Sequence, residues 1–379
     1  MTNAVIAGYV RSPFSFASKG ELTKVRPDDM AAQVIMALIQ RTGVNPEDIE
    51  DLLLGCSFPE GEQGLNVARL VGLAAGLPLS VGGATINRFC GSSMQSIHSA
   101  AGAIACGAGD VFIAAGVESM TRVPMGGFNP MPNPDLYMRM PEAYMPMGET
   151  AENVAERYNL SREQQDSFAV ESQKKAASAR EAGKFQDEII AIERNGEVVA
   201  EQDTCLRPET TLEKLATLDP AFVEGGTVTA ATSSPLTDGA SATLVCSEDY
   251  AAKKGLAPLA RIKSFAISGC APDVMGLGPI GASQKALKRA ALTINDIDII
   301  ELNEAFASQA LASIKELEID PGKVNIDGGA IALGHPLGAT GARITGKAAA
   351  LLKRENKKYA LSTQCIGGGQ GIATVLEAV

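Results

Sequence analysis

The stretch Asn87-Arg-Phe-Cys-Gly-Ser-Ser93 stands where a short apolar run gives way to a helix-like run of small residues. A similar transition occurs at Gly334-His-Pro-Leu-Gly-Ala-Thr340, again before a helix-like run. Cys90 and His335 hold comparable places in these two stretches, 245 residues apart (335 − 90 = 245). Because self-similarity at a fixed offset indicates repeated structural units, we interpret the chain as one α/β unit present twice.

The repeat extends upstream of both stretches. Val44–Leu54 and Leu292–Leu302 each pass from a helical end through a turn into an apolar strand. Ile49 aligns with Ile297 at an offset of 248 (297 − 49 = 248), close to the offset between Cys90 and His335. The two copies therefore share a register over more than one element.

Downstream, strands are predicted at 111–116 and at 359–365, and each is followed by another strand. In the second copy the next strand comes at once, at 371–376, whereas in the first copy its counterpart lies at 239–245. The segment 118–236 is therefore interpreted as an insertion into the first copy. It contains a long polar helical stretch with an N-cap candidate at Ser161.

Each copy alternates strands with helices, a pattern typical of a mostly parallel or mixed sheet that is covered by helices. If the two copies pack face to face, equivalent helix N-termini meet, and Cys90 and His335 meet with them. The predicted divisions are an N-terminal half (1–117 plus 237–257), an inserted loop domain (118–236) and a C-terminal half (258–379).

Composition restricts the possible functions. A net charge of −11 makes the chain a poor non-specific binder of nucleic acid. An odd count of seven cysteines, no CxxC pair and only two histidines argue against a zinc site and against a secreted disulfide framework. The apolar runs are too short or too interrupted to span a bilayer, and no leader pattern is apparent. We expect a cytoplasmic protein that needs no metal.

Two thiols and an imidazole are the candidates for chemistry. Cys90 precedes a helix, whose dipole is expected to lower the pKa of the thiol and favour the nucleophilic thiolate. His335, at the second helix start, can take that proton, and Cys365 precedes a glycine run at a strand end. Each has an ordinary alternative: a packed cysteine, a helix-capping histidine, a simple turn. Together they suit acyl transfer between thiols.

Five blocks resemble the signatures of the thiolase family, in the family's order and spacing. The resemblance covers essentially the whole chain. The blocks are Asn87-Arg-Phe-Cys-Gly-Ser-Ser93, Thr227-Val-Thr-Ala230 with Ser233-Ser-Pro-Leu-Thr-Asp-Gly239, Asn303-Glu-Ala-Phe306, Gly334-His-Pro-Leu-Gly338 and Cys365-Ile-Gly-Gly-Gly369.

This resemblance implies the duplicated thiolase fold, with two βαβαβαββ-type halves in an α-β-α-β-α arrangement. The implied activity is that of an acetyl-CoA C-acyltransferase, which cleaves 3-ketoacyl-CoA with CoA through an acyl-Cys90 intermediate. His335 would activate Cys90 and, with a water held by Asn303, form one oxyanion hole. The N–H groups of Cys90 and Gly367 would form the second, and Cys365 would be the general acid and base.

The resemblance also implies binding sites. Ser234 matches a serine that contacts pantetheine, and Arg207 fits the spacing of an arginine near the adenine end of CoA. We place Met147 and Phe306 in the acyl pocket. Seven of the twelve methionines fall between positions 120 and 147, and methionine side chains adapt to varied apolar shapes, which suits the wall of such a pocket. CoA is a substrate, and no separate cofactor is implied.

Several alternatives stay open at the level of sequence. The chain lacks a histidine in the insertion and has Thr232-Ser-Ser234 where many biosynthetic acetoacetyl-CoA thiolases have Asn-Ala-Ser, which favours the degradative class. A non-catalytic thiolase-like lipid carrier and a condensing ketosynthase are the other candidates. The family resemblance implies a homodimer or homotetramer, with a hydratase/dehydrogenase subunit as a further possible partner.

Overall fold

One continuous mixed sheet runs through both halves of the chain in the computed structural model, which describes residues 2–379. Across the sheet the strands are β4 (Gly82–Ile86), β3 (Asp51–Gly55), β5 (Val111–Ser119), β8 (Thr237–Ser247), β1 (Ala4–Arg11), β9 (Ala260–Gly269), β12 (Gln370–Glu377), β11 (Tyr359–Ile366) and β10 (Ile299–Leu302). The short β2 (Ser15–Phe16) pairs with β8, and β6 (Ile192–Arg194) and β7 (Glu197–Ala200) form a separate hairpin.

The strand order is symmetric about the β1–β9 junction. On one side β1, β8, β5 and β3 follow one another, and on the other side β9, β12, β11 and β10 do the same with matching directions. The two sides join where Val5 pairs with Arg261 and Ile6 pairs with Ala260. The 3-10 turns Pro46–Asp48 (η2) and Ile294–Asp296 (η6) also correspond. The predicted duplication is confirmed.

The two halves differ at their outer edges. The counterpart of β4 in the C-terminal half is a single bridge between Ile300 and Val324. The next residue, Asn325, has a positive φ of 45°, which ends the extended backbone. Its side chain accepts a hydrogen bond from Leu302 N (3.0 Å) and donates one to Leu302 O (2.8 Å). An asparagine side chain therefore replaces the backbone groups of a fifth strand.

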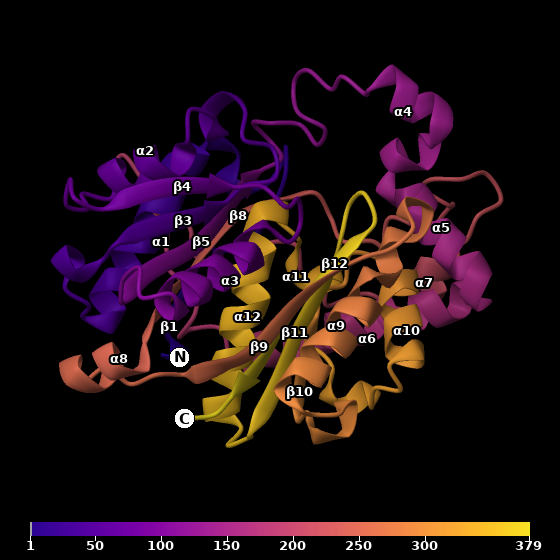
Figure 1. Cartoon of the computed structure of the whole chain (residues 1–379). Helices are drawn as coiled ribbons and strands as arrows, with labels where there is room; N and C mark the ends of the chain where they lie inside the picture. The colour runs from indigo at the N-terminus through magenta and orange to yellow at the C-terminus, as the bar shows by residue number, and fades with distance from the viewer. Residues whose placement is uncertain (1) are drawn as a thin grey trace.

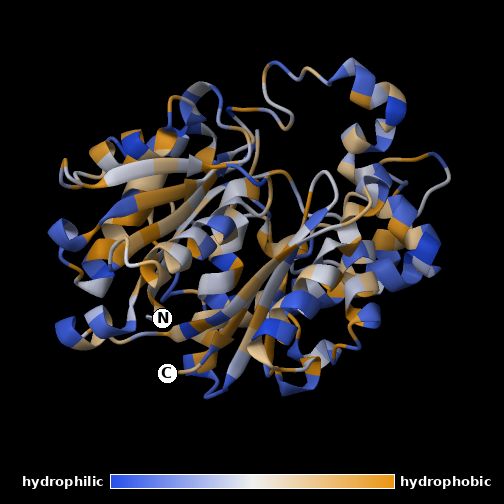
Figure 2. Ribbon diagram, in the orientation of Figure 1, coloured by the Kyte–Doolittle hydropathy of each residue, from blue (hydrophilic) through white to orange (hydrophobic). Residues whose placement is uncertain are grey.

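The strands of the two halves form two layers, and the helices form three layers that alternate with them (Figure 1). One outer layer holds α1 (Pro27–Thr42) and α2 (Val67–Ala74), and the other holds α9 (Gly278–Ala290) and α10 (Ala307–Glu316). The inner layer holds α3 (Ser92–Ala105) and α12 (Leu337–Arg354), and α12 contacts strands of both halves. The α-β-α-β-α arrangement expected from the sequence is present. Figure 2 shows hydrophobic residues concentrated on the strands.

The insertion supplies α4 (Pro134–Arg139), α5 (Met147–Tyr158), α6 (Arg162–Glu181) and α7 (Leu212–Ala216). The predicted polar helical stretch is two helices, because Ser161 caps α6 in a capping box with Gln164. An arm that carries α4 extends away from the body of the molecule (Figure 1). The domain boundaries given above stay predictions. Smaller elements are α8 (Glu248–Lys254), α11 (Ala330–Leu333), η1 (Glu21–Lys24), η3 (Gly61–Gln63), η4 (Pro141–Tyr144), η5 (Pro272–Leu277) and η7 (Pro321–Lys323).

A buried ion network ties the insertion to both halves. Arg11 of β1 pairs with Glu188 (2.9 Å) and Asp203 (2.7 Å) of the insertion. Lys347 of α12 pairs with the same Glu188 (2.9 Å) and with Asp327 (2.9 Å). All five side chains are buried, and buried charges persist when each has an opposite partner. No helix in residues 2–379 is long and apolar enough to cross a bilayer.

The two inner helices touch through glycines. A Cβ added at Gly341 of α12 would collide with the amide nitrogen of Met94 in α3. A Cβ at Gly116 of β5 would collide with the carbonyl oxygen of Gly338 in the first turn of α12. Backbone cannot move aside as a flexible side chain can, so glycine is required for this close approach.

We expect Gly341→Ala to lower the free energy of unfolding by roughly 1–3 kcal/mol, because overpacking a tight contact forces the backbone to shift. Gly102→Ala is the matched control, since it lies in α3 with open space around the added Cβ. That substitution should stabilise the chain by about 0.5–1 kcal/mol. Urea unfolding monitored by circular dichroism measures both, and equal effects of the two variants would contradict the prediction.

Candidate active site

Cys90 lies in a tight loop between β4 and α3. The preceding Phe89 has a positive φ of 43°, which is uncommon for a bulky residue. Asn87 Oδ1 accepts from Phe89 N (2.9 Å), and Ser92 Oγ donates to Phe89 O (2.6 Å). Gly91 then caps α3. These local hydrogen bonds hold the turn that presents Cys90 ahead of the helix.

The Cys90 thiol faces two backbone donors, its own N–H and the N–H of Gly367. The expected lowering of its pKa is wrong: burial raises the pKa of Cys90 to about 11, although both N–H groups oppose the rise. The thiol has only 2% of its surface exposed, and desolvation outweighs the helix dipole there. Cys90 therefore rests as a thiol and needs a base when it attacks.

His335 follows Gly334, whose φ of 104° is open to glycine but not to other residues, and precedes α12. Its Nδ1 lies 2.6 Å from Thr340 Oγ1, and that hydroxyl donates to Pro336 O (2.9 Å). Since the hydroxyl hydrogen is engaged, Thr340 accepts from Nδ1–H. Nε2 is therefore the free base. Burial, followed by the charge of Arg343, lowers the pKa of His335 to about 3, so the ring is neutral.

Asn303 stands directly after β10 and beside His335. Its backbone N–H donates to Thr363 O of β11 (3.0 Å), which fixes the loop to the neighbouring strand. Its Nδ2 lies 3.3 Å from His335 Nε2. Its Oδ1 is buried without a hydrogen-bond partner among residues 2–379, and buried polar atoms usually have one. The amide is thus free to hold a water or a ligand beside the imidazole.

Cys365 ends β11 on the other side of the site. Its side chain has no exposed surface, and it packs with Phe306, Met275 and the half-buried Met147. Burial raises the pKa of Cys365 well above its ordinary value, and the proximity of Cys90 raises it further. The two thiols therefore share one low-polarity site in which each disfavours ionisation of the other.

The residues next to Cys90 and Gly367 in the chain reach the protein surface. Phe89 keeps 39% of its area exposed, and Gly368 is exposed beside the buried Gly367. A Cβ at Gly367 would meet Met147 Sδ at 3.7 Å and Phe89 at 3.7 Å, ordinary contact distances. Phe89 and Met147 therefore flank Gly367.

Ser234 and Arg207 lie further out. Ser234 N donates to Ala305 O (2.9 Å), which puts it beside Phe306 at the entrance to the site. Arg207 is exposed and stacks on Phe16 at 4.9 Å. It lines a surface cavity of about 450 Å³ whose other walls include Lys214, Leu215, Leu218, Ala230 and Ala231. The family resemblance implied a role in CoA binding for both residues, but the cavity was not predicted from the sequence.

Most methionines of the insertion are away from this site. Met131 and Met138 are 89% and 83% exposed on the arm that carries α4, so they line no buried tunnel. Met120 is buried and packs with Cys90 and Leu337. Of the insertion's methionines, Met120 packs with Cys90 and Met147 packs with Cys365.

Three residues near the site had no role assigned from the sequence, although Thr340 closes the stretch that begins at Gly334. Thr340 sets the His335 tautomer. Gln364 Nε2 donates to the carbonyl oxygen of Cys90. Glu118 is fully buried and accepts from Ser57 N (2.8 Å) and Gly338 N (2.9 Å), which links both halves. Only Glu118 had a signal, as a charged residue that ends an apolar strand.

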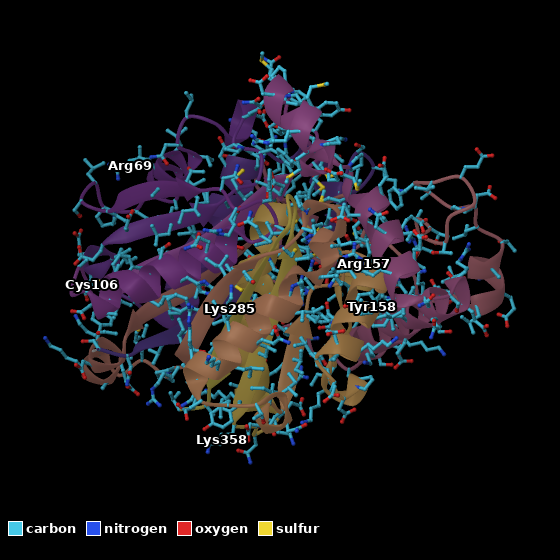
Figure 3. All side chains as sticks on the ribbon, turned by 45° about the vertical axis from the view of Figure 1, so that its right-hand side comes forward. Arg69, Cys106, Arg157, Tyr158, Lys285 and Lys358 are labelled. Atoms are coloured by element: carbon cyan, nitrogen blue, oxygen red, sulfur yellow. The ribbon has the colours of Figure 1, made fainter. Side chains whose placement is uncertain are left out.

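The remaining cysteines and the second histidine lie outside this arrangement. Cys106 is exposed at the outer edge of the N-terminal half (Figure 3). Cys270 is half-buried, and its N–H donates to Gly369 O (2.8 Å). His98 stacks on Phe265 and contacts Thr374 (2.8 Å) inside the sheet layers. Within residues 2–379, no three His, Cys, Asp or Glu side chains group as metal ligands would.

The arrangement combines a shielded nucleophile, a neutral base and two sets of hydrogen-bond donors. The N–H groups of Cys90 and Gly367 form one set. The other set forms when Nε2 of His335, which carries a lone pair at rest, takes up a proton beside the Asn303 amide. Paired donors of this kind stabilise negative oxygen atoms that form in acyl transfer. The second thiol, Cys365, can exchange a proton in the same space.

Comparison with known proteins assigns the family. The family model "Thiolase, N-terminal domain" matches residues 4–249, and "Thiolase, C-terminal domain" matches residues 256–378. A 3-ketoacyl-CoA thiolase of Bacillus subtilis is 49% identical over 389 residues, covering 100% of both chains. One of Psychrobacter cryohalolentis is 48% identical and covers 100% of this chain and 98% of the relative.

A solved structure agrees with these sequence matches. The human mitochondrial 3-ketoacyl-CoA thiolase in complex with CoA superposes with a TM-score of 0.92 at 38% identity, covering 100% of this chain and 98% of that chain. Likeness of fold and of sequence thus extends over the full length, through both halves and the insertion. The chain belongs to the thiolase family.

Proposed function

We propose that this chain is an acetyl-CoA C-acyltransferase that cleaves 3-ketoacyl-CoA with CoA, giving acetyl-CoA and an acyl-CoA two carbons shorter. The observation that carries the proposal is that the buried Cys90 meets the N–H of Gly367 and lies near the buried thiol of Cys365. The neutral His335 stands two residues before Leu337, which packs with Cys90. The printed names of the full-length relatives support the same activity.

In the first half-reaction, His335 Nε2 takes the Cys90 proton as the sulfur attacks the 3-keto carbon. The N–H groups of Cys90 and Gly367 are well placed for the alkoxide that forms. Each such donor is worth roughly 3 kcal/mol of barrier. The bond between carbons 2 and 3 then breaks, leaving acyl-Cys90 and the enolate of acetyl-CoA. Asn303 with a bound water and the imidazolium stabilise the enolate oxygen, and Cys365 protonates its carbon.

In the second half-reaction, a new CoA enters. The Cys365 thiolate takes the CoA thiol proton, and the CoA sulfur attacks the acyl-Cys90 thioester. The same two backbone donors hold the second tetrahedral alkoxide. When the Cys90–acyl bond breaks, the leaving thiolate recovers its proton from His335. The protein returns to its starting state, and no electron transfer takes place.

The adenine nucleotide of CoA is proposed to occupy the cavity at Arg207. Arg207 and Lys214 supply positive charge for phosphate groups, and Leu215 and Leu218 supply an apolar wall. Ala231 of the cavity wall packs against the cluster that contains Ala307, the residue after Phe306, which favours a path from the cavity towards the two thiols. Pantetheine would run along this path past Ser234. The acyl chain would lie between Met147 and Phe306.

The breakdown direction is part of the proposal. The distinction from an acetoacetyl-CoA-specific biosynthetic enzyme rests on the insertion, which contains no histidine, and on Thr232-Ser-Ser234 in place of Asn-Ala-Ser. A lipid carrier would not need two thiols, a tautomer-fixed imidazole and two donor pairs. A ketosynthase uses Cys-His-His or Cys-His-Asn, so the second reactive cysteine, Cys365, favours a thiolase.

Assembly into a homodimer or homotetramer is also proposed. Leu65 and Leu79 are 89% and 80% exposed, and Leu70 and Leu73 are 40% and 44% exposed, all close to the edge strand β4. Exposed apolar side chains gathered at one edge are typical of an interface. The seven cysteines are free thiols, which fits a reducing compartment and therefore a cytoplasmic location.

The purified chain is expected to release acetyl-CoA from 3-ketoacyl-CoA substrates when CoA is present. Loss of absorbance of the substrate enolate, measured over a series of chain lengths, gives kcat and KM. Cys90→Ala should reduce kcat at least about 1,000-fold, because the acyl acceptor is gone. Exposed Cys106→Ala is the control and should match the parent. A parent chain inert on every length would refute the function.

Cys365→Ala should lower thiolysis by roughly 100- to 10,000-fold, the usual contribution of a general acid or base. Cys270→Ala is the matched control, since Cys270 adjoins the same glycine loop but has no step assigned. Rates of acetyl-CoA release and thermal midpoints should be recorded for both variants. Comparable activity of Cys365→Ala and Cys270→Ala would remove Cys365 from the mechanism.

Arg207→Gln should raise KM for CoA about tenfold while kcat changes little, because the nucleotide end takes no part in bond making. The control is Arg194→Gln, an exposed arginine on the β6–β7 hairpin away from the proposed cavity. Initial rates at saturating 3-ketoacyl-CoA and varied CoA give both constants. An unchanged KM would move the nucleotide site elsewhere.

A further inference from the structure

The turn that presents Cys90 is held in an unfavourable backbone conformation. Phe89 occupies the left-handed region at φ 43°, which is unfavourable for a residue with a side chain. Strained backbone persists where surrounding contacts over-determine it. The bonds from Asn87 and Ser92 are local to the turn, so they cannot fix its position relative to the C-terminal half.

Gln364 supplies a contact that crosses between the halves. It is fully buried on β11, and its Nε2 donates to the carbonyl oxygen of Cys90. Side chains two apart on a strand share a face, so Gln364 and Ser362 both point towards the inner helices while Cys365 points away. Gln364, which directly precedes the proposed general acid Cys365, thus holds the backbone of the proposed nucleophile Cys90.

A second contact repeats this link on the other side of Gly367. Arg88 Nη1 donates to Gln370 Oε1 (2.9 Å), and Arg88 Nε donates to Gln95 Oε1 of α3 (3.0 Å). Gln364 and Gln370 lie three residues before and three residues after Gly367. Both therefore join the Cys90 loop to the two ends of the segment that carries Gly367.

The turn approaches that segment closely enough for these links to matter. A Cβ at Gly91 would lie 2.6 Å from Ile366 Cδ1, so the loop and the end of β11 are in direct contact. The N–H of Cys90 comes from the first half and the N–H of Gly367 from the second. A pair of donors stabilises one oxygen only while both keep the same target.

We propose that Gln364, with Arg88–Gln370 as a second link, is a positioning residue that keeps the N–H groups of Cys90 and Gly367 aimed at one oxygen atom. The inference rests on the proposed acyl transfer. Gln364 touches no substrate, and its effect passes through the Cys90 backbone. Its loss disturbs the oxyanion hole and leaves the thiol, the base and the CoA cavity in place.

The expected signature is a loss in kcat with little change in KM, because the two N–H groups bind an oxyanion that forms only in the transition state. Removal of one oxyanion-hole donor costs about 100- to 1,000-fold. A displaced donor keeps part of its effect, so Gln364→Met should lower kcat roughly 10- to 100-fold. Gln370→Met breaks the outer link alone and should lower kcat less.

Alkylation of Cys90 by iodoacetamide separates positioning from general damage. That reaction needs the thiol and the base but forms no oxyanion, so its rate in Gln364→Met should stay within about twofold of the parent. Ser362→Ala is the matched control, since it removes a buried hydrogen bond to Thr345 on the same strand face. It should leave kcat and the alkylation rate unchanged.

Steady-state thiolysis, alkylation rates and thermal midpoints are measured on the full chain for all three variants. A fall in kcat with KM and alkylation preserved supports the positioning role. Unchanged kcat in Gln364→Met, parallel losses of kcat and alkylation, or unfolding of both glutamine variants but not of Ser362→Ala would overturn it. If the parent itself cleaves no 3-ketoacyl-CoA, the proposed function fails instead.

Discussion

The backbone contact between the first turns of α3 and α12 is the constraint on which the site depends. Gly341 against Met94 allows α12 to approach α3 until no side chain fits between them, and Gly116 of β5 allows the same close approach to Gly338 in the first turn of α12. Because Cys90 precedes α3 and His335 precedes α12, the approach brings the segments that carry them together, and Cys90 packs with Leu337, two residues after His335. The buried bonds of Glu118 to Ser57 and Gly338 hold the same junction from the N-terminal half.

Burial sets the electrostatics of this point. Desolvation raises the pKa of Cys90 to about 11 and lowers that of His335 to about 3, so both groups are uncharged at neutral pH. A neutral pair avoids the cost of two buried charges and forms them only as the reaction proceeds. The fixed N–H donors of Cys90 and Gly367 then stabilise the negative charge that develops in the transition state, and a preorganised site lowers the barrier most by stabilising such charge.

Much of this could be predicted from the sequence. The offset between Ile49 and Ile297 predicted the duplication, because equivalent turns favour similar residues at equivalent positions. The block residues Cys90 and His335 stand at helix starts, where proline and glycine mark the position. The direction of the Cys90 pKa shift could not be predicted, since it depends on burial by distant segments. The role of Gln364 could not be predicted either. The pattern of its strand predicts only that the strand is buried, and Cys90, the hydrogen-bond partner of Gln364, lies 274 residues away (364 − 90 = 274).

The asparagine that ends the C-terminal sheet edge has a consequence for growth of the sheet. Asn325 satisfies both backbone groups of Leu302, so β10 presents no free ladder there to another molecule. At the opposite end β4 has a neighbour on one side only. Within this sheet the edge at β4 is the one left open, so strand pairing through it joins at most two copies and cannot extend the sheet into a fibre.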